Sequence, residues 1–239
     1  MSIDQRLKEI RREPSTDAAG DPERLRRIAL TKQEMMAQGE AIRATLEGNK
    51  EPLAAIGSDL VNRNIRRIIT VGCGDSWIAG HGVRPAVEEA LDAPCEPVEA
   101  FDLANYGLNT IDDQTLVVGL SSSGETEPVI KSLTVSAAKG AYTVGLSNTL
   151  GSTLMKQCPG ALHIVATRGG WPTQSSTAAM ALMVAMAASV QKAKGGDVAV
   201  LEAALHDLPQ QAETVAQSFY EPARAVAQHL AKVNMVLTT

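Results

Sequence analysis

The chain has 239 residues, of which 44% are hydrophobic but only 3% aromatic, and its formal net charge is −5. This length allows one large or two small domains with a core of aliphatic side chains. The acidic balance and the scarcity of aromatic rings exclude a general nucleic-acid or anionic-membrane surface, so we expect neither partner. A small anion is still an acceptable ligand, because helix N-termini and loop amides bind phosphate without basic side chains.

The cysteines indicate the redox environment in which the protein folds. Three cysteines, Cys73, Cys95 and Cys158, are odd in number and have no CxxC spacing, which argues against a disulfide framework or a zinc site. We expect reduced thiols, a cytoplasmic location, and neither a metal nor a cofactor. The N-terminus lacks the apolar core of a signal peptide. The most apolar run, residues 178–190, falls short of the roughly 18–20 residues that span a bilayer.

Residues 1–50 are expected to form an N-terminal helical segment. Asp21 followed by Pro22 predicts an N-cap and a first helical turn, and apolar residues at helical spacing extend this helix to about residue 46. The stretch 48–50, Gly-Asn-Lys, predicts its end. A second helix over 51–64 then leads into the first strand.

Residues 51–195 alternate short apolar runs with helical stretches, which predicts one α/β domain. The runs at 115–120 and 162–166 are continuous rather than alternating, as in strands buried on both faces of a parallel sheet. We therefore expect a flavodoxin-like three-layer α/β/α sandwich around a parallel five-stranded sheet. The predicted strands are 67–71, 96–99, 115–120, 142–146 and 162–166, and the predicted helices are 77–91, 125–138, 150–157 and 175–194.

The C-terminal segment, residues 196–239, is predicted to form two helices broken near Pro222 and a last strand, NMVLTT, at 234–239. A terminal strand with no following turn or helix is unusual in this architecture. We interpret the segment as linker helices and the first strand of a second α/β unit. The alternative is an edge strand that closes the same sheet.

The first motif is Gly-Cys-Gly-Asp-Ser at 72–76, between a strand and a helix. Its two glycines allow a tight turn and a close approach to a ligand, and Ser76 stands at the helix entrance, where a hydroxyl caps the helix or binds an anion. A glycine pair after the first strand also begins dinucleotide-binding folds. Trp77, however, stands where that fingerprint has its third glycine, which disfavours a nucleotide.

The second motif is Ser-Ser-Ser-Gly-Glu-Thr at 121–126, again between a strand and a helix. Four hydroxyls in six residues, together with the amides of a first helical turn, match the acceptor oxygens of one phosphate. A capping box built on Ser123 is the alternative, but one cap needs only one hydroxyl. Glu125 would repel the phosphate, so we expect it to point away and hold neighbouring backbone or a partner subunit.

A third segment, 169–177, is also glycine-rich, then hydroxyl-rich, then helical. Simple helix capping explains it almost as well as ligand binding does. All three loops follow the carboxyl ends of predicted strands, which is the edge where open α/β sheets bind ligands.

Taken together, these segments resemble the sugar isomerase (SIS) family. GCGDS, SSSGET, SNTLGSTL and PTQSST occur in the order and spacing of an SIS domain, and TKQEMMAQGEAIRATL resembles the helical lead-in of these proteins. The resemblance covers about residues 30–239, and SGET is its most specific part. It is similar to the first SIS domain of glucosamine-6-phosphate synthases, to ketose/aldose isomerases and to fructosamine-phosphate deglycases.

The resemblance implies that hydroxyls of the first two motifs bind the phosphate of a sugar and that residues 171–173 line the sugar end. Two positions depart from the family. Ser122 stands where glutamine is common and reaches less far, and Asp75 stands where threonine or serine is common. Its carboxylate weakens phosphate binding unless it turns outward or meets a sugar hydroxyl. The candidate ligand-binding residues are Cys73, Gly74, Ser76, Ser121, Ser122, Ser123, Thr126, Trp171 and Thr173.

Aldose–ketose isomerisation needs a base near the reacting carbons. None of the four histidines lies in a hydroxyl-rich loop; His81 is the nearest in sequence. The resemblance implies that the catalytic Glu and His lie in a second SIS domain, so we assign no catalytic residue here. Two hypotheses follow: part of a phosphosugar isomerase, deaminase or deglycase, or a non-catalytic phosphosugar sensor. SIS domains usually pair, so we also expect a homodimer.

Overall fold

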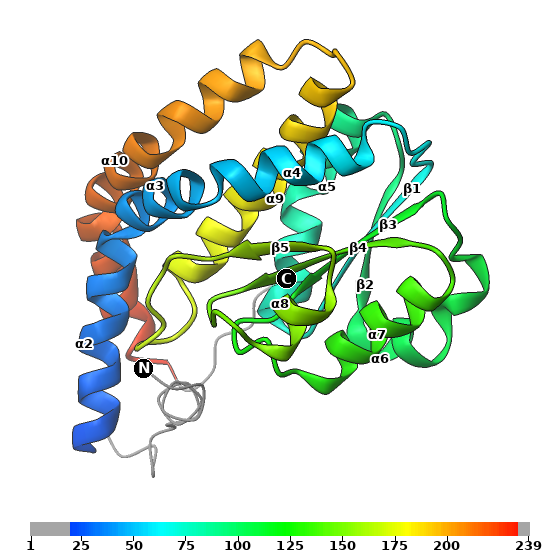
Figure 1. The fold of residues 1–239 in the computed structure, drawn as a ribbon. Coiled ribbons are helices and arrows are strands. Elements are labelled where there is room, and N and C mark those ends of the chain that lie inside the picture. Colours follow the sequence, from blue (N-terminus) through cyan, green and yellow to red (C-terminus); the bar gives the residue numbers. More distant parts are fainter. Residues whose placement is uncertain (1–19, 234–239) are drawn as a thin grey trace.

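The computed structural model describes residues 20–233, and the predicted strand at 234–239 lies outside them. Within these residues a central sheet is covered by helices on both faces (Figure 1). The helices are α2 (Pro22–Met36), α3 (Gln38–Gly48), α4 (Lys50–Leu60), α5 (Asp75–Leu91), α6 (Ala100–Asn105), α7 (Glu127–Ala138), α8 (Thr153–Gln157), α9 (Gln174–Ala193) and α10 (Ala199–Leu230), with a 3-10 turn at Gly107–Thr110. The strands are β1 (Arg67–Gly72), β2 (Cys95–Glu99), β3 (Thr115–Leu120), β4 (Tyr142–Ser147) and β5 (Gly160–His163).

The sheet is parallel throughout, with the order β2-β1-β3-β4-β5. The predicted five-stranded α/β/α sandwich is therefore confirmed. The chain leaves β1 toward one edge of the sheet and returns to β3 before continuing to the other edge. Strands β1 and β3 thus flank the point where the direction of winding reverses, and ligands bind at that point in open α/β sheets.

The central strands are buried on both faces, as the continuous apolar run at 115–120 predicts. Leu116 and Val118 pack into the larger core, which lies between the sheet and α3, α4, α5 and α9. Val117 points to the opposite face and packs against Val129 and Leu133 of α7 in the smaller core. Each face therefore has its own layer of helices.

The edge strand β5 differs from its prediction. It is shorter and begins earlier than 162–166, and its residues alternate between buried and half-buried. Leu162 is fully buried, whereas the backbone of His163 lies along the open edge, where the side chain of Asn49 accepts from its N–H at 2.8 Å and donates to its C=O at 2.7 Å. The Asn49 side chain thus forms the two hydrogen bonds that a neighbouring strand would otherwise form with the backbone of His163.

The N-terminal helix is broken, contrary to the single helix predicted over 22–46. At Ala37 the backbone takes φ −98° and ψ 12°, and its N–H bonds to the carbonyls of Gln33 and Glu34. This break lets α3 pack on α9 while α2 runs beside α10 (Figure 1). The reason is tertiary: both segments contact α10, but only α3 also packs extensively on α9.

The C-terminal segment shows the opposite error. The sequence predicts a break near Pro222, but α10 is one helix of 32 residues with Pro209 and Pro222 inside it. An interior proline removes one backbone hydrogen bond and does not by itself end a helix. The short α6 was not predicted either, because six residues carry too little periodicity to indicate a helix. None of the described helices combines the length and apolar character that crossing a bilayer requires.

Candidate functional site

The loop after β1 delivers the first motif to the start of α5. Gly74 is the N-cap of α5, and Ser76 lies half-buried in the first helical turn, where its N–H donates to the carbonyl of Cys73. The Trp77 indole donates to the carbonyl of Pro97 at 3.3 Å. The indole therefore fills the space beside β2, while Ser76 stands at the positive end of a 17-residue helix.

The loop after β3 gathers the second motif. Ser121 Oγ lies 2.8 Å from Thr126 Oγ1 and 3.4 Å from Ser123 Oγ, so three of the predicted hydroxyls form one cluster. Ser121 Oγ also accepts from the N–H of Gly124, and Ser123 Oγ accepts from the N–H of Glu125. Thr126 is the N-cap of α7 but makes no capping bond with its side chain. The cluster is thus more than a helix cap.

The loop turns at Gly124, which has φ +67°. A Cβ there would overlap Ser152 and come within 2.8 Å of Ser147 Oγ, so only glycine fits. The hydroxyls of Ser147 and Thr149 both donate to the carbonyl of Ser122, each at 3.2 Å. The segment after β4 therefore supports the loop at 121–126, a role that the sequence did not reveal.

Glu125 points away from the hydroxyl cluster. Its Oε1 accepts from the N–H of Thr153 at 2.8 Å, at the start of α8. The expectation that it holds neighbouring backbone is confirmed. Its negative charge lies at the start of α8 rather than beside the hydroxyl cluster.

The third loop reaches the first through Asp75. Asp75 Oδ2 accepts from Ser176 Oγ at 3.2 Å, and its Oδ1 lies 3.8 Å from the guanidinium of Arg168. The carboxylate thus joins the start of α5 to the start of α9. Arg168 was not among the predicted site residues; a lone arginine before a glycine pair gave no signal that it would lie at another loop.

Trp171 and Thr173 lie in the same third loop but differ in their surroundings. The guanidinium carbon of Arg27 lies 4.6 Å from the centroid of the Trp171 ring. Trp171 is 39% exposed. Thr173 is the N-cap of α9, and its hydroxyl oxygen is buried without a hydrogen-bond partner among the described residues. A buried hydroxyl without a protein partner usually forms its hydrogen bond with a ligand or a water molecule.

Cys73 lies at the site but is not an activated nucleophile. Burial, together with a hydrogen bond and the negative charge of Glu99, raises the pKa of the Cys73 thiol to about 11. Nearly all of it is protonated at neutral pH, and the thiolate is the reactive form.

The histidines supply no base to the hydroxyl cluster. The His81 ring packs edge-on against Trp77, and His163 Nε2 lies 3.2 Å from the carbonyl of Asn148. His206 and His229 lie exposed on α10. Among the described residues, no group of three His, Cys, Asp or Glu side chains is arranged to hold a metal. The site is built from hydroxyls and amides.

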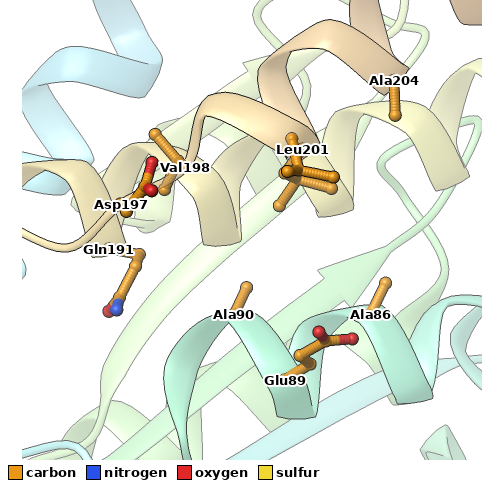
Figure 2. Close-up of a pocket in the computed structure, with 9 residues that line it drawn as sticks. Ala86, Glu89, Ala90, Gln191, Asp197, Val198, Leu201 and Ala204 are labelled. Carbon is orange, nitrogen blue, oxygen red and sulfur yellow. The ribbon is translucent and has the colours of Figure 1, made fainter.

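A hollow of about 450 Å³ opens elsewhere, between the C-terminal half of α5, the end of α9 and the start of α10 (Figure 2). Its walls are aliphatic, and it carries the carboxylates of Glu89 and Asp197 (Figure 2). Two negative charges repel a phosphate, and this end of α5 is the negative end of the helix. The hollow is therefore a poorer anion site than the hydroxyl cluster at the start of α7.

Comparison with known proteins identifies the family of the chain. A family model described as SIS domain matches residues 63–189, just over half of the chain. Glutamine–fructose-6-phosphate aminotransferase [isomerizing] of Aquifex aeolicus is 28% identical over 205 residues, which is 85% of this chain and 33% of that protein. The chain spans between about a fifth and a third of the length of the curated relatives it matches.

Two solved structures share the fold. Tagatose-6-phosphate ketose/aldose isomerase from Escherichia coli superposes with a TM-score of 0.63 at 16% identity, covering 87% of this chain and 56% of that chain. A protein of E. coli CFT073 in complex with a sugar phosphate gives a TM-score of 0.58 at 20% identity, covering 74% of this chain and 95% of that one. The matched residues of the family model contain all five strands, the GCGDS and SSSGET loops and most of α9. The chain belongs to the SIS family.

Proposed function

We propose that this chain binds a sugar phosphate, with the phosphate at the Ser121–Thr126 loop and the sugar toward Trp171 and Thr173. The observation that carries the proposal is the hydroxyl cluster of Ser121, Ser123 and Thr126 at the reversal point of a parallel sheet. Three hydroxyls and the amides of a helix start offer many donors, and the nearby carboxylate of Asp75 is engaged by Arg168 and Ser176. The sugar-phosphate complex of the E. coli CFT073 protein supports this ligand class.

The remaining candidates take supporting places in this proposal. Ser76 donates to the phosphate from the start of α5, while Cys73 and Gly74 form the wall of the same loop. Ser122, which is nearly buried, holds the loop through its carbonyl, and its hydroxyl adds a short-range contact. Thr173 gains the hydrogen-bond partner that its buried oxygen lacks.

For the reaction, we propose aldose–ketose isomerisation, or the related deamination or deglycation, of a sugar 6-phosphate or amino-sugar phosphate. The names of the Aquifex relative and of the tagatose-6-phosphate isomerase support this class. In this proposal, this chain binds the phosphate. A second SIS unit, joined through residues 196–239, supplies the catalytic acid and base. The N-terminal segment 1–50 and the domain at 51–195 are then the first two parts of that arrangement.

The second candidate is a non-catalytic phosphosugar sensor. It is favoured by the histidines, which lie away from the hydroxyl cluster. Incubation with fructose 6-phosphate, followed by NMR of the sugar, separates the two candidates: interconversion supports an isomerase, whereas binding without turnover supports a sensor.

We further propose a homodimer in the cytoplasm. Apolar side chains on α2 and α10 are exposed, including Ile28, Met35, Val215 and Phe219, which is the kind of surface that a partner covers. The three unpaired cysteines are compatible with a reducing compartment. Light scattering at micromolar concentration tests the assembly, and a monomer would contradict it.

The ligand class is tested by isothermal titration with fructose 6-phosphate, glucosamine 6-phosphate, arabinose 5-phosphate and NAD. We expect sugar phosphates to bind and NAD not to bind. Loss of binding in Ser123→Ala and Thr126→Ala would place the phosphate at the cluster. Equal binding by these variants and the wild type, or selective binding of NAD, would refute the proposal.

A further inference from the structure

Helix α2 carries a buried carboxylate that faces the third loop. Glu34 is 4% exposed. Its Oε1 accepts from the Thr167 hydroxyl at 2.8 Å and from the Gly169 N–H at 2.7 Å, and its Oε2 accepts from the Gly170 N–H at 3.1 Å. Three donors from one short loop therefore compensate a buried negative charge.

The loop touches α2 at further points. The Trp171 N–H donates to Thr31 Oγ1 at 2.9 Å, and Arg27 stacks over the Trp171 ring. A Cβ on Gly170 would come within 2.6 Å of Thr31 Cα, so glycine allows the loop to lie against the helix. Residues 167, 169, 170 and 171 thus all make contact with α2.

Arg168, in the middle of these contacts, extends toward the site. Its guanidinium lies 3.8 Å from Asp75 Oδ1 at the start of α5, and its side chain is 23% exposed. An ion pair at that distance leaves most of the five guanidinium donors available to a ligand. Ser76 follows Asp75 in the chain, so the cation stands beside the proposed anion site.

We propose that Glu34 is a positioning residue, whose carboxylate fixes the loop 167–171 so that Arg168 reaches the mouth of the site and contacts an oxygen of the bound sugar phosphate. This inference rests on the proposed function. A carboxylate suits the task because it only accepts, and its two oxygens take all three loop donors. Glutamine has the same size, but its NH₂ group would face a backbone N–H and leave the loop under-anchored.

The first test is Glu34→Gln, with isothermal titration of fructose 6-phosphate. We expect the affinity to fall about tenfold, the effect of losing one charge-assisted hydrogen bond to the ligand. Arg168→Gln should produce a similar loss, and the double variant should lose little more, because the first change acts through Arg168. Glu40→Gln, an exposed carboxylate on α3, is the matched control and should bind as the wild type does.

Hydrogen exchange separates release of the loop from general destabilisation. In Glu34→Gln, we expect the amides of Gly169 and Gly170 to exchange faster, while those of β3 keep their protection. Should this variant fail to fold, Gly170→Ala pushes the same loop away from Thr31 of α2, and the same losses are expected.

Three results would overturn the inference: unchanged exchange at Gly169 and Gly170, an affinity of Glu34→Gln within twofold of the wild type despite faster exchange, or fully additive losses in the double variant. Absence of sugar-phosphate binding by the wild type would be a different failure. It would refute the proposed function, and the exchange measurement would still decide whether Glu34 holds the loop.

Discussion

Replacing Ser121 by alanine removes the hydroxyl at the centre of the proposed phosphate site, and the structure separates its effect on binding from its effect on folding. Ser121 Oγ accepts from the Gly124 N–H, but that N–H also donates to the Ser121 carbonyl at 3.0 Å. No backbone donor is left unpaired, so we expect a stability loss of about 1 kcal/mol, or about 2–4 °C in Tm. A hydrogen bond to the charged phosphate contributes more, about 1.5–3 kcal/mol, which is about 10- to 150-fold in Kd.

The assay is isothermal titration with fructose 6-phosphate beside thermal unfolding of the unliganded protein. The matched control is Ser132→Ala, because Ser132 is another fully buried serine, whose hydroxyl donates to the carbonyls of Ala100 in α6 and Pro128 in α7. It should cost similar stability and leave Kd within twofold. If Ser121→Ala bound as tightly as the wild type, or if both variants weakened binding equally, the placement of the phosphate would be wrong.

Three further predictions concern charge, thiol chemistry and backbone strain. Asp75→Asn removes a negative charge beside the site and releases Arg168; titration at low salt should show severalfold tighter binding of sugar phosphate, and a gain that persists at high salt would contradict this screening argument. Cys73 should react slowly with iodoacetamide at pH 8, because its pKa is raised to about 11; Glu99→Gln removes part of that rise, so peptide mapping should show faster alkylation. Gly124→Ala should lose about 2 kcal/mol or more in urea unfolding, since φ +67° strains alanine and its Cβ overlaps neighbours; a loss under about 0.5 kcal/mol would show that the turn relaxes.

The sequence by itself determined the sheet and the edge of it at which the hydroxyl-rich loops lie. The nearly continuous apolar run at 115–120 favoured burial on both faces, as in the middle of a covered parallel sheet. The hydroxyl motifs follow the ends of β1 and β3, and the carboxyl ends of parallel strands share one edge. The order of strands and loops along the chain therefore predicts that Ser76 and Ser121 lie at the same edge of the sheet.

Tertiary structure decided everything that depended on a partner far along the chain. Glu34 and Thr167, or Asn49 and His163, are more than a hundred residues apart, and neither side of such a pair carries a local signal. The same holds for the break at Ala37, which lets α3 pack on α9 and α10. The continuity of α10 has another cause, because residues 221–230 around Pro222 are exposed and an interior proline removes only one backbone hydrogen bond. Hydrophobic periodicity and turn residues carry information about the local sequence only. The free energy of a buried charge or an open sheet edge depends instead on which distant group forms hydrogen bonds with it.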